Sequence, residues 1–521
     1  MRTPAPWLVP LPDAETMRAV DRWAIDERGV SGLELMERAG AGVAQAVETL
    51  APDGPVTVVC GKGNNGGDGL VVARLLRHAG RPVTVVCLAP AEDYTGDALA
   101  NLQRLPGDPP VQLSEAAWAG QAALVDAVLG TGFRGVPRDA AAEAIDALNR
   151  ADASVVSVDV PSGVDASTGV VSGAAVHAAL TVTFHAAKPG LWIRPGKAHA
   201  GVVQTLDIGI PRGAPGDAPV GLIAPSVLAQ LPVRGASSTK FSSGHVLVVG
   251  GSRGLTGAPR MAAEASMRAG AGYVTACIPA SLQDVIATAG TPEVMTRGLP
   301  GDDDGALTPD ALAGVREASA RVGAIALGPG LGRSAGAFAF ARALAAEADV
   351  ALVLDADGLN AHAGSLGDLA ARAGPTVLTP HAGELGRLLE LDSAEIERER
   401  LRHVRAAAAL AAAVVVLKGD DTLIAAPDGS VAVSAGGSPS LATAGTGDVL
   451  SGVIAALLAQ GVDAFTAAAA GVWLHAEAGR RAALRVGAAE GVIATDVIAA
   501  LPAARRRGAC DDRGVAEGGN G

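Results

Sequence analysis

Short apolar runs alternate with longer segments of helical spacing along most of the chain. Residues 56–60 are continuously apolar, whereas residues 13–50 before them and residues 70–79 after them carry apolar side chains every three or four positions. Strands buried on both faces of a parallel sheet have the first pattern, and helices that cover such a sheet have the second. With the next apolar run at residues 83–88, the pattern predicts two leading helices and then a strand–helix–strand unit.

The alternation continues through the chain and has one clear interruption. Residues 211–219 are rich in proline and glycine, which is typical of a linker. The sequence therefore predicts two α/β domains, at residues 1–215 and 222–502, and a charged, disordered tail at residues 503–521. Further strands are expected at residues 124–129, 155–160, 180–184, 202–206, 245–249, 273–278, 325–328, 351–355, 377–379 and 414–418.

A glycine-rich turn, residues 445–448, leads into the strongly apolar residues 449–458. Backbone N–H groups converge in such a turn, and the following helix adds the positive end of its dipole, so the turn suits an anion. Because a carboxylate repels an anion, Asp448 is interpreted as the base that takes a proton from a hydroxyl group during phosphoryl transfer. The alternative is that Asp448 is an ordinary capping residue of the helix.

A second glycine-rich loop, GKGNNGGDG at residues 61–69, follows the first predicted strand. Its glycines satisfy the G-x-G-x-x-G pattern of dinucleotide-binding folds. That fold also needs an acidic residue at the end of the second strand, about 20 residues later, and Glu92 and Asp93 come too late. A P-loop is excluded because Lys62 is not followed by Ser or Thr. The loop is therefore expected to bind a ligand in another way.

Two more loops place polar groups where strands end. Residues 130–136 follow the run at 124–129, and residues 161–165 follow the run at 155–160. Open α/β sheets bind ligands at the carboxyl ends of their strands, so these loops are candidates for the same site.

Composition removes several classes of protein. The 521 residues carry 41 Lys and Arg against 54 Asp and Glu, a net charge of −13, so nucleic acid is not expected as a partner. The four cysteines, Cys60, Cys87, Cys277 and Cys510, lie far apart, which argues against a disulfide framework or a zinc site. No apolar stretch reaches the length of a membrane span, and a cytoplasmic protein without membrane contact is expected.

Motifs of the second half occur in an order that identifies a family. Residues 328–332, 354–360, 378–384 and 417–424, followed by the turn at 445–448, resemble the ADP-dependent NAD(P)H-hydrate dehydratases. The resemblance covers about residues 222–500. It implies a ribokinase-like doubly wound α/β domain, ADP as co-substrate and Asp448 as the catalytic base.

The same resemblance implies binding residues. Contacts to the adenine nucleotide (ADP or AMP) are implied at Lys418, Gly419, Asp420, Asp421, Thr422 and Gly447. Contacts to the hydrated coenzyme are implied at Ala258, Gly330, Gly332, His381 and Asp448. For His381 the alternative is a structural histidine at a strand end. Mg²⁺ is expected on general grounds of phosphoryl transfer, without an assignment of its ligands.

The first half resembles the NAD(P)H-hydrate epimerase family. The resemblance rests on residues 61–69, on residues 36–40 and on the loops at 130–136 and 161–165. It implies a Rossmann-like three-layer domain that binds the hydrated nucleotide through Asn64, Asn65, Gly66, Gly67, Asp68, Gly130, Thr131, Gly132, Phe133, Arg134, Gly135, Val136 and Asp159. It also implies a K⁺ site at Asn65, Asp126 and Ser162. For Asp126 the alternative is a buried carboxylate that ties down a neighbouring loop.

Taken whole, the chain resembles the bifunctional NAD(P)H-hydrate repair enzymes. The resemblance implies that one domain interconverts the R and S hydrates of NADH and NADPH, and that the other dehydrates the S form with ADP, giving AMP and phosphate. A homo-oligomer is expected. One alternative is a ribokinase-like small-molecule kinase with an N-terminal nucleotide-binding regulatory domain, and another is a first half that binds its ligand without catalysis.

Overall fold

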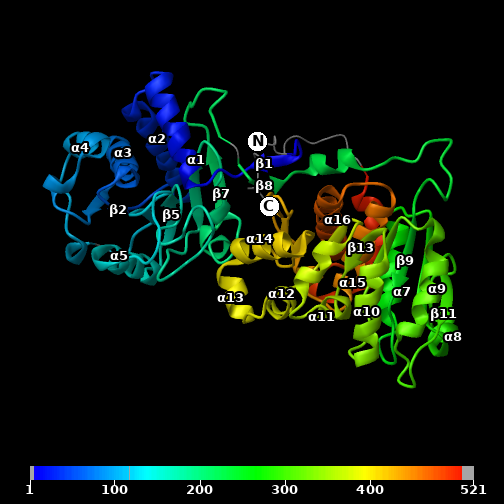
Figure 1. Ribbon diagram of the computed structural model, residues 1–521. Coiled ribbons are helices and arrows are strands. Elements are labelled where there is room, and N and C mark those ends of the chain that lie inside the picture. The colour runs from blue at the N-terminus through cyan, green and yellow to red at the C-terminus, as the bar shows by residue number, and fades with distance from the viewer. Residues whose placement is uncertain (1–4, 117, 217, 507–521) are drawn as a thin grey trace. The chain divides into compact units, whose positions relative to one another are not determined.

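A computed structural model describes residues 5–116, 118–216 and 218–506 (Figure 1). These residues form two compact units, one made of residues 10–221 and the other of residues 222–506 together with residues 5–9. The predicted tail lies outside the described residues from residue 507 onward, as does Cys510. None of the described helices is long and apolar enough to cross a membrane.

The first unit is built on a six-stranded sheet in the order β3-β2-β4-β5-β6-β7, and every pair of neighbouring strands is parallel. The helices α1, α2, α3 and α4 share a core with one face of the sheet, and α5 shares another core with the opposite face. The three predicted layers are therefore present. The strands are β2 (Val56–Cys60), β3 (Val83–Cys87), β4 (Ala123–Ala127), β5 (Ser154–Val158), β6 (Leu180–Phe184) and β7 (Val202–Leu206), and the helices are α1 (Ala14–Arg22), α2 (Gly32–Leu50), α3 (Asn64–His78), α4 (Gly96–Gln103), α5 (Asp139–Arg150) and α6 (Lys197–Ala200).

The second unit contains an eleven-stranded sheet in the order β1-β8-β17-β16-β15-β14-β13-β12-β9-β10-β11. The strands from β15 to β11 in this order are parallel, and β16 and β17 add an antiparallel hairpin at β15. The strands are β1 (Leu8–Pro10), β8 (Val220–Ile223), β9 (His245–Val249), β10 (Tyr273–Pro279), β11 (Met295–Leu299), β12 (Ala324–Leu327), β13 (Ala351–Leu354), β14 (Thr376–Leu378), β15 (Val414–Leu417), β16 (Leu423–Ala425) and β17 (Val431–Val433).

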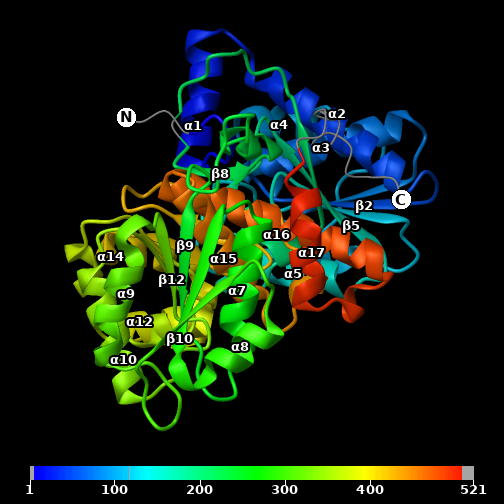
Figure 2. The same ribbon diagram turned by 90° about the vertical axis from the view of Figure 1, so that its right-hand side faces the viewer.

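Helices cover both faces of this sheet, as Figure 2 shows. On one face α15 lies in a large core with α7, α16 and α17, and its apolar residues are almost all buried because the helix is surrounded. The helices are α7 (Gly257–Arg268), α8 (Gln283–Ala289), α9 (Leu312–Ala318), α10 (Ala335–Glu347), α11 (Asp357–Asn360), α12 (Ala382–Leu389), α13 (Ser393–Arg398), α14 (Arg400–Ala411), α15 (Thr446–Ala459), α16 (Ala464–Val486) and α17 (Ala494–Ala504). The doubly wound α/β prediction is confirmed.

The strand β1 is a feature that the hydrophobic pattern does not predict. It precedes the two leading helices and joins the sheet of the second unit. The reason lies next to it: the Trp7 side chain is buried in the core of that unit, with its ring 5.6 Å from the ring of Phe465. A strand of three residues is too short to show a period of two, so only its partner reveals it.

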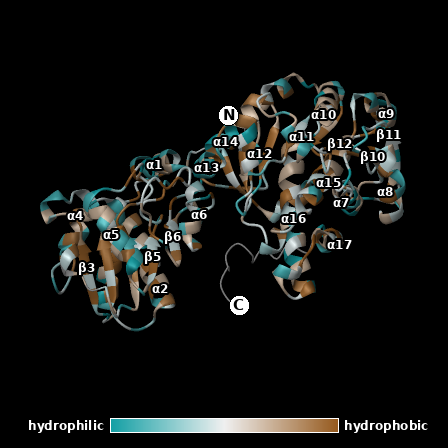
Figure 3. Ribbon diagram, turned by 90° about the horizontal axis from the view of Figure 1, so that it is seen from below, coloured by the Kyte–Doolittle hydropathy of each residue, from teal (hydrophilic) through white to brown (hydrophobic). Residues whose placement is uncertain are grey.

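The hydropathy of the chain follows the layers. In Figure 3 the strands are coloured mainly as hydrophobic, whereas the helices carry hydrophilic colour on part of their surface. This is the pattern expected when a sheet is covered on both faces, and it leaves polar side chains to gather at the strand ends.

Candidate active sites

The first unit holds a cavity of about 890 Å³ at the carboxyl ends of β2, β4 and β5. The order of strands in the sheet reverses between β2 and β4, which is the position where open α/β sheets bind ligands. The predicted residues that line the cavity are Asn64, Asn65, Asp68, Gly130, Thr131, Gly132, Phe133 and Asp159. The lining does not include Gly66, Gly67, Arg134, Gly135 and Val136, which belong to the same loops.

Two glycines, one before α3 and one in its first turn, allow a close approach of backbones. A Cβ atom on Gly61 would lie 2.2 Å from the carbonyl oxygen of Val128, and a Cβ atom on Gly66 would lie 1.7 Å from the carbonyl oxygen of Gly61. Gly61 therefore packs against the loop after β4, and Gly66 packs against Gly61, so these two glycines of the dinucleotide pattern have a packing role here.

A buried ion pair lies at the bottom of the cavity. Lys188 is 1% exposed, and its Nζ donates hydrogen bonds to Asp159 Oδ1 and Thr183 Oγ1, both at 2.7 Å. Asp159 Oδ2 accepts from Thr131, from the backbone N–H at 3.0 Å and from Oγ1 at 2.5 Å. Burial works against the charge of Asp159, but Lys188 and these donors outweigh it and lower the pKa. Asp159 is therefore an anion fixed by three partners.

Lys188 was not predicted as a site residue. It follows β6 and reaches Asp159 across 29 positions of sequence. The loop at residues 185–192, HAAKPGLW, matches none of the motifs named above, so only the fold shows the role of this lysine.

Asp21 in α1 and Asp68 in α3 are among the other carboxyl residues that line the same cavity. Burial, and then the charges of Asp159 and Asp21, raise the pKa of Asp68 well above its usual range. Burial also raises the pKa of Asp21, against the effect of Lys188. The cavity thus combines a carboxylate whose pKa is lowered with carboxyl groups whose pKa values are raised, and such opposed shifts are typical of groups that transfer protons.

Asp126 is fully buried at 0% exposure, and both its oxygens accept hydrogen bonds. Oδ1 accepts from Ser162 Oγ at 2.5 Å and from the Val128 N–H at 3.3 Å, and Oδ2 accepts from Ser157 Oγ and the Ser162 N–H, both at 2.8 Å. Burial raises the pKa of Asp126, and these donors work against the rise. The loops after β4 and β5 are held together by this carboxylate, as the structural alternative states.

In the second unit, the turn before α15 has the predicted form. Gly445 adopts φ +89° and caps the helix, with no side-chain hydrogen bond at the cap. Asp448 lies in the first turn, and within the described part of the chain its carboxylate takes part in no hydrogen bond or ion pair. The interpretation of Asp448 as an ordinary capping residue is therefore wrong, because Gly445 occupies that position.

Three charged side chains surround the turn. Lys418, at the end of β15, lies 3.1 Å from Asp355 Oδ1 and 3.7 Å from Glu384 Oε2. Ser451 Oγ donates to the other oxygen of Asp355 at 2.6 Å. Burial and the nearby charge of Asp355 raise the pKa of Asp448 to about 7, although Lys418 works in the opposite direction. Asp448 is thus an unpaired carboxyl group that titrates near neutral pH, which suits a general base.

Asp355 and Glu384 belong to motifs that identify the family but were not predicted as site residues. Asp355 follows β13, and its partners Lys418 and Ser451 are 63 and 96 positions away. A strand-end Asp is the signal that could have found Asp355, because β13 and β15 both end at this edge.

A buried ion pair holds the loop at residues 418–422 in place. Arg400 is 1% exposed, and its guanidinium binds the fully buried carboxylate of Asp421 and the carbonyl oxygen of Lys418. Gly419 is required beside this pair, because a Cβ atom there would lie 2.6 Å from Arg400 Nη2. The carboxylate of Asp421 is therefore occupied in shaping the loop. Thr422 Oγ1 closes it by donating to the Gly419 carbonyl at 2.6 Å.

The other predicted coenzyme contacts fall into two places. Ala258, Gly330 and Gly332 lie together where the strand order reverses between β9 and β12: a Cβ atom on Gly330 would be 3.2 Å from that of Ala258. His381 begins α12, where its Nδ1 accepts from the N–H groups of Gly383 and Glu384. His381 therefore caps α12, and its half-exposed ring lies beside Glu384.

Comparison with known proteins decides the family. Residues 246–503 match the family described as NAD(P)H-hydrate dehydratase, and residues 32–190 match the family described as YjeF-related protein N-terminus. A protein of Moorella thermoacetica, described as bifunctional NAD(P)H-hydrate repair enzyme Nnr, is 41% identical over 506 residues, which covers 94% of this chain and 95% of that protein. The chain belongs to the family of bifunctional NAD(P)H-hydrate repair enzymes.

Another member of the family and a solved structure are also similar to this chain. The Escherichia coli protein of the same description is 35% identical over 493 residues, covering 94% of this chain and 92% of that protein. A solved structure of ADP/ATP-dependent NAD(P)H-hydrate dehydratase from Bacillus subtilis, co-crystallised with ATP/Mg²⁺, is 29% identical and covers 53% of this chain and 94% of that chain, with a TM-score of 0.45.

The family membership confirms the predicted enzyme class. The chain is a bifunctional NAD(P)H-hydrate epimerase and NAD(P)H-hydrate dehydratase, in that order along the sequence. The small-molecule kinase with a regulatory domain and the non-catalytic first half are both less consistent with relatives that match along nearly the whole chain.

Proposed function

We propose that the first unit interconverts R- and S-NAD(P)HX and that the second unit dehydrates the S form with ADP. The observation that carries the second assignment is the unpaired Asp448 carboxyl group, whose pKa is raised to about 7 at the first turn of α15. The initial N–H groups of that helix have no acceptor within the helix, so they can bind a phosphoryl group beside the base.

The dehydration needs a better leaving group than hydroxide. Asp448 takes the proton of the substrate hydroxyl group. The hydroxyl oxygen bonds to the β-phosphorus of ADP, and AMP departs. The C–O bond then breaks with its electron pair going to phosphate, and loss of a proton from the neighbouring carbon restores the double bond of the dihydronicotinamide ring. Lys418 and the N–H groups of residues 444–447 stabilise the charge on the moving phosphoryl group.

Mg²⁺ fits this site by the chemistry of its donors. Asp355 and Asp448 carry carboxylate oxygens, the ligands that Mg²⁺ prefers, next to the proposed position of the nucleotide phosphates. When bound, the ion neutralises phosphate charge. The positive charge of Lys418 would also neutralise part of the phosphate charge. The proposed nucleotide contacts are Lys418, Gly419, Asp420, Asp421, Thr422 and Gly447, and the proposed coenzyme contacts are Ala258, Gly330, Gly332, His381 and Asp448.

In the epimerase cavity the chemistry takes place at one carbon that bears both a hydroxyl group and the ring nitrogen. When the two epimers interconvert, the bond between this carbon and the ring nitrogen breaks and forms again. The hydroxyl group gives up a proton, and the ring nitrogen, as the leaving group, takes one up. The pKa values of Asp68 and Asp21 are raised and that of Asp159 is lowered, so we assign proton transfer to this cluster, with Lys188 fixing the position of Asp159. The proposed nucleotide contacts are the predicted residues that line the cavity: Asn64, Asn65, Asp68, Gly130, Thr131, Gly132, Phe133 and Asp159. Contacts from Gly66, Gly67, Arg134, Gly135 and Val136 stay predictions.

K⁺ fits the predicted site by its oxygen donors. The carboxylate of Asp126, the hydroxyl of Ser162 and the carbonyl of Leu129 lie together, with Ser162 Oγ 3.2 Å from that carbonyl oxygen. The buried side-chain nitrogen of Asn65 has no hydrogen-bond partner among the described residues, so the amide is free to orient its oxygen toward a cation. A bound K⁺ would supply positive charge beside the nucleotide phosphate. A homo-oligomer and a cytoplasmic location stay predictions.

The pH dependence of dehydration follows from the pKa of Asp448. Because the base must be ionised, kcat/KM for the S hydrate should rise about tenfold per pH unit below pH 7 and level off above about pH 8. In Asp355→Asn the negative neighbour is removed and Lys418 is released toward Asp448, so the midpoint should move to lower pH. Measurement of kcat/KM between pH 5 and 9 checks both; an unchanged midpoint in Asp355→Asn contradicts the assignment.

A further inference from the structure

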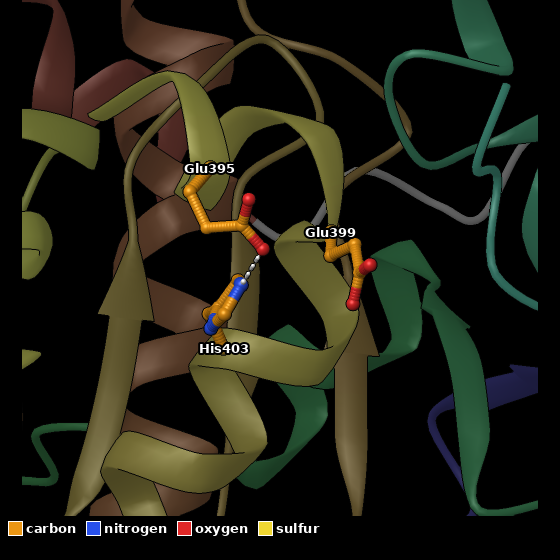
Figure 4. Close-up of side chains that lie close together, drawn as sticks. All are labelled: Glu395, Glu399 and His403. Atoms are coloured by element: carbon orange, nitrogen blue, oxygen red, sulfur yellow. Dashed lines mark ion pairs between the residues drawn. The ribbon is translucent and has the colours of Figure 1, made fainter. Parts of the chain in front are cut away.

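The junction between α13 and α14 gathers three side chains that neither active site uses. Glu395, Glu399 and His403 each offer one ligand atom, and the three atoms lie within 4.8 Å of one another. In Figure 4 the side chains of Glu395 and His403 point toward each other, with Glu399 beside them. We propose that this cluster, the 395–403 site, binds a divalent transition-metal ion such as Zn²⁺.

The backbone at Glu399 creates the cluster. In an unbroken helix, residues eight positions apart are about 12 Å apart along the axis, too far for Glu395 and His403 to meet. Glu399 leaves the helical conformation, with φ −128° and ψ 50°, and so ends α13 and begins α14. This break brings Glu395 Oε1 to 3.4 Å from His403 Nε2.

The imidazole of His403 is the second observation that points to a ligand. His403 is only 6% exposed, and its Nε2 has no hydrogen-bond partner in the described part of the chain. Buried polar atoms are normally satisfied, and a metal ion would satisfy this one.

The donor set selects the class of metal. One imidazole nitrogen and two carboxylate oxygens are the ligands of zinc and related ions, whereas Mg²⁺ prefers oxygen alone. Arg398 contacts Glu395 Oε2, and Arg402 donates to Glu399 Oε2 at 2.7 Å. These arginines weaken the negative field but leave Glu395 Oε1 directed at His403. The part-exposed glutamates give the ion access from solvent.

The site is tested with the full chain, stripped of metal and free of nucleotide. Titration with ZnCl₂ against a chromophoric chelator should show one ion per chain at this site, and His403→Gln and Glu395→Gln should each weaken binding at least about tenfold. The exposed His78 gives a matched control: His78→Gln should bind zinc as the unchanged chain does. Asp448→Asn should also retain the ion, which separates it from a metal in the dehydratase site.

Cobalt supplies a spectroscopic reading of the same ligands. Co²⁺ should give visible absorption bands that are lost in His403→Gln and retained in His78→Gln. Zinc affinity equal in the unchanged chain, His403→Gln and Glu395→Gln overturns the proposal, as does the absence of zinc binding by the unchanged chain. If His403→Gln fails to fold, Glu395→Gln decides, because that side chain is part-exposed.

Discussion

Asp448→Asn should lower ADP-dependent dehydration of the S hydrate by about 10³-fold, within the range for loss of a general base. The substitution keeps the size of the side chain and the N–H groups of the turn, and no hydrogen bond or ion pair among the described residues depends on the carboxylate. ADP should therefore still bind. Single-turnover measurement of AMP release, with nucleotide affinity by calorimetry, separates the chemical step from binding.

The stability of Asp448→Asn provides its control. The pKa of Asp448 is raised in the folded chain, so the folded state binds this proton more tightly than the unfolded state, and stability falls as pH rises toward about 7. At pH 8 the ionised group costs free energy, and Asp448→Asn should raise stability by about 1–2 kcal/mol after allowance for its partial exposure. Epimerisation in the first unit should be unchanged. Near-normal dehydration by a folded variant would remove Asp448 from the mechanism.

Asp126→Asn should abolish conversion of the R hydrate while dehydration of the S hydrate continues. The amide has no negative charge to attract a cation. Its N–H₂ group also replaces an oxygen that accepts hydrogen bonds from donors such as the Ser162 N–H. The variant should also lose about 1–3 kcal/mol of stability, the usual effect of a buried donor without an acceptor. The measurement is the fraction of a mixed-epimer pool consumed, corrected for spontaneous epimerisation.

Potassium distinguishes a cation ligand from a purely structural carboxylate. In the unchanged chain, replacing Na⁺ by K⁺ should raise substrate affinity in the epimerase cavity, and Asp126→Asn should remove this response. Ser157→Ala is the matched control, because Ser157 donates to Asp126 Oδ2 but is not a proposed ligand. Equal K⁺ responses in the unchanged chain and Asp126→Asn would leave Asp126 only its structural role.

The fold could be predicted from the sequence because parallel strands buried on both faces read as unbroken apolar runs. Val56–Cys60 and Val414–Leu417 are both entirely buried, and each was expected as a strand. The strand β1 could not be predicted, since its three residues are stabilised by a partner strand about 210 positions later and by the burial of Trp7. Short strands owe their existence to tertiary contacts.

Site residues that stand together in one turn could be predicted from the sequence. Site residues that act through contacts with distant parts of the chain could not. Gly445 and Asp448 stand in one glycine-rich turn, so the sequence shows them together. Lys188 and Asp355 act through partners that are distant in sequence; Lys188 has no local pattern, and Asp355 has only its position at a strand end. The acceptor role of His381 at the start of α12 also depends on the helix geometry.

We expect the two units together to repair both hydrates, and one incubation tests this expectation. Mixed R and S hydrates are supplied with ADP, Mg²⁺ and K⁺, and the reduced-nicotinamide absorbance is followed while AMP and phosphate are measured. The account predicts complete conversion of both epimers to the reduced coenzyme, with one AMP and one phosphate per molecule repaired. Two results would contradict this expectation. One is a stable phosphorylated product without recovery of the reduced nicotinamide. The other is enzymatic conversion of the S form alone, with the R form consumed only at the spontaneous rate of epimerisation.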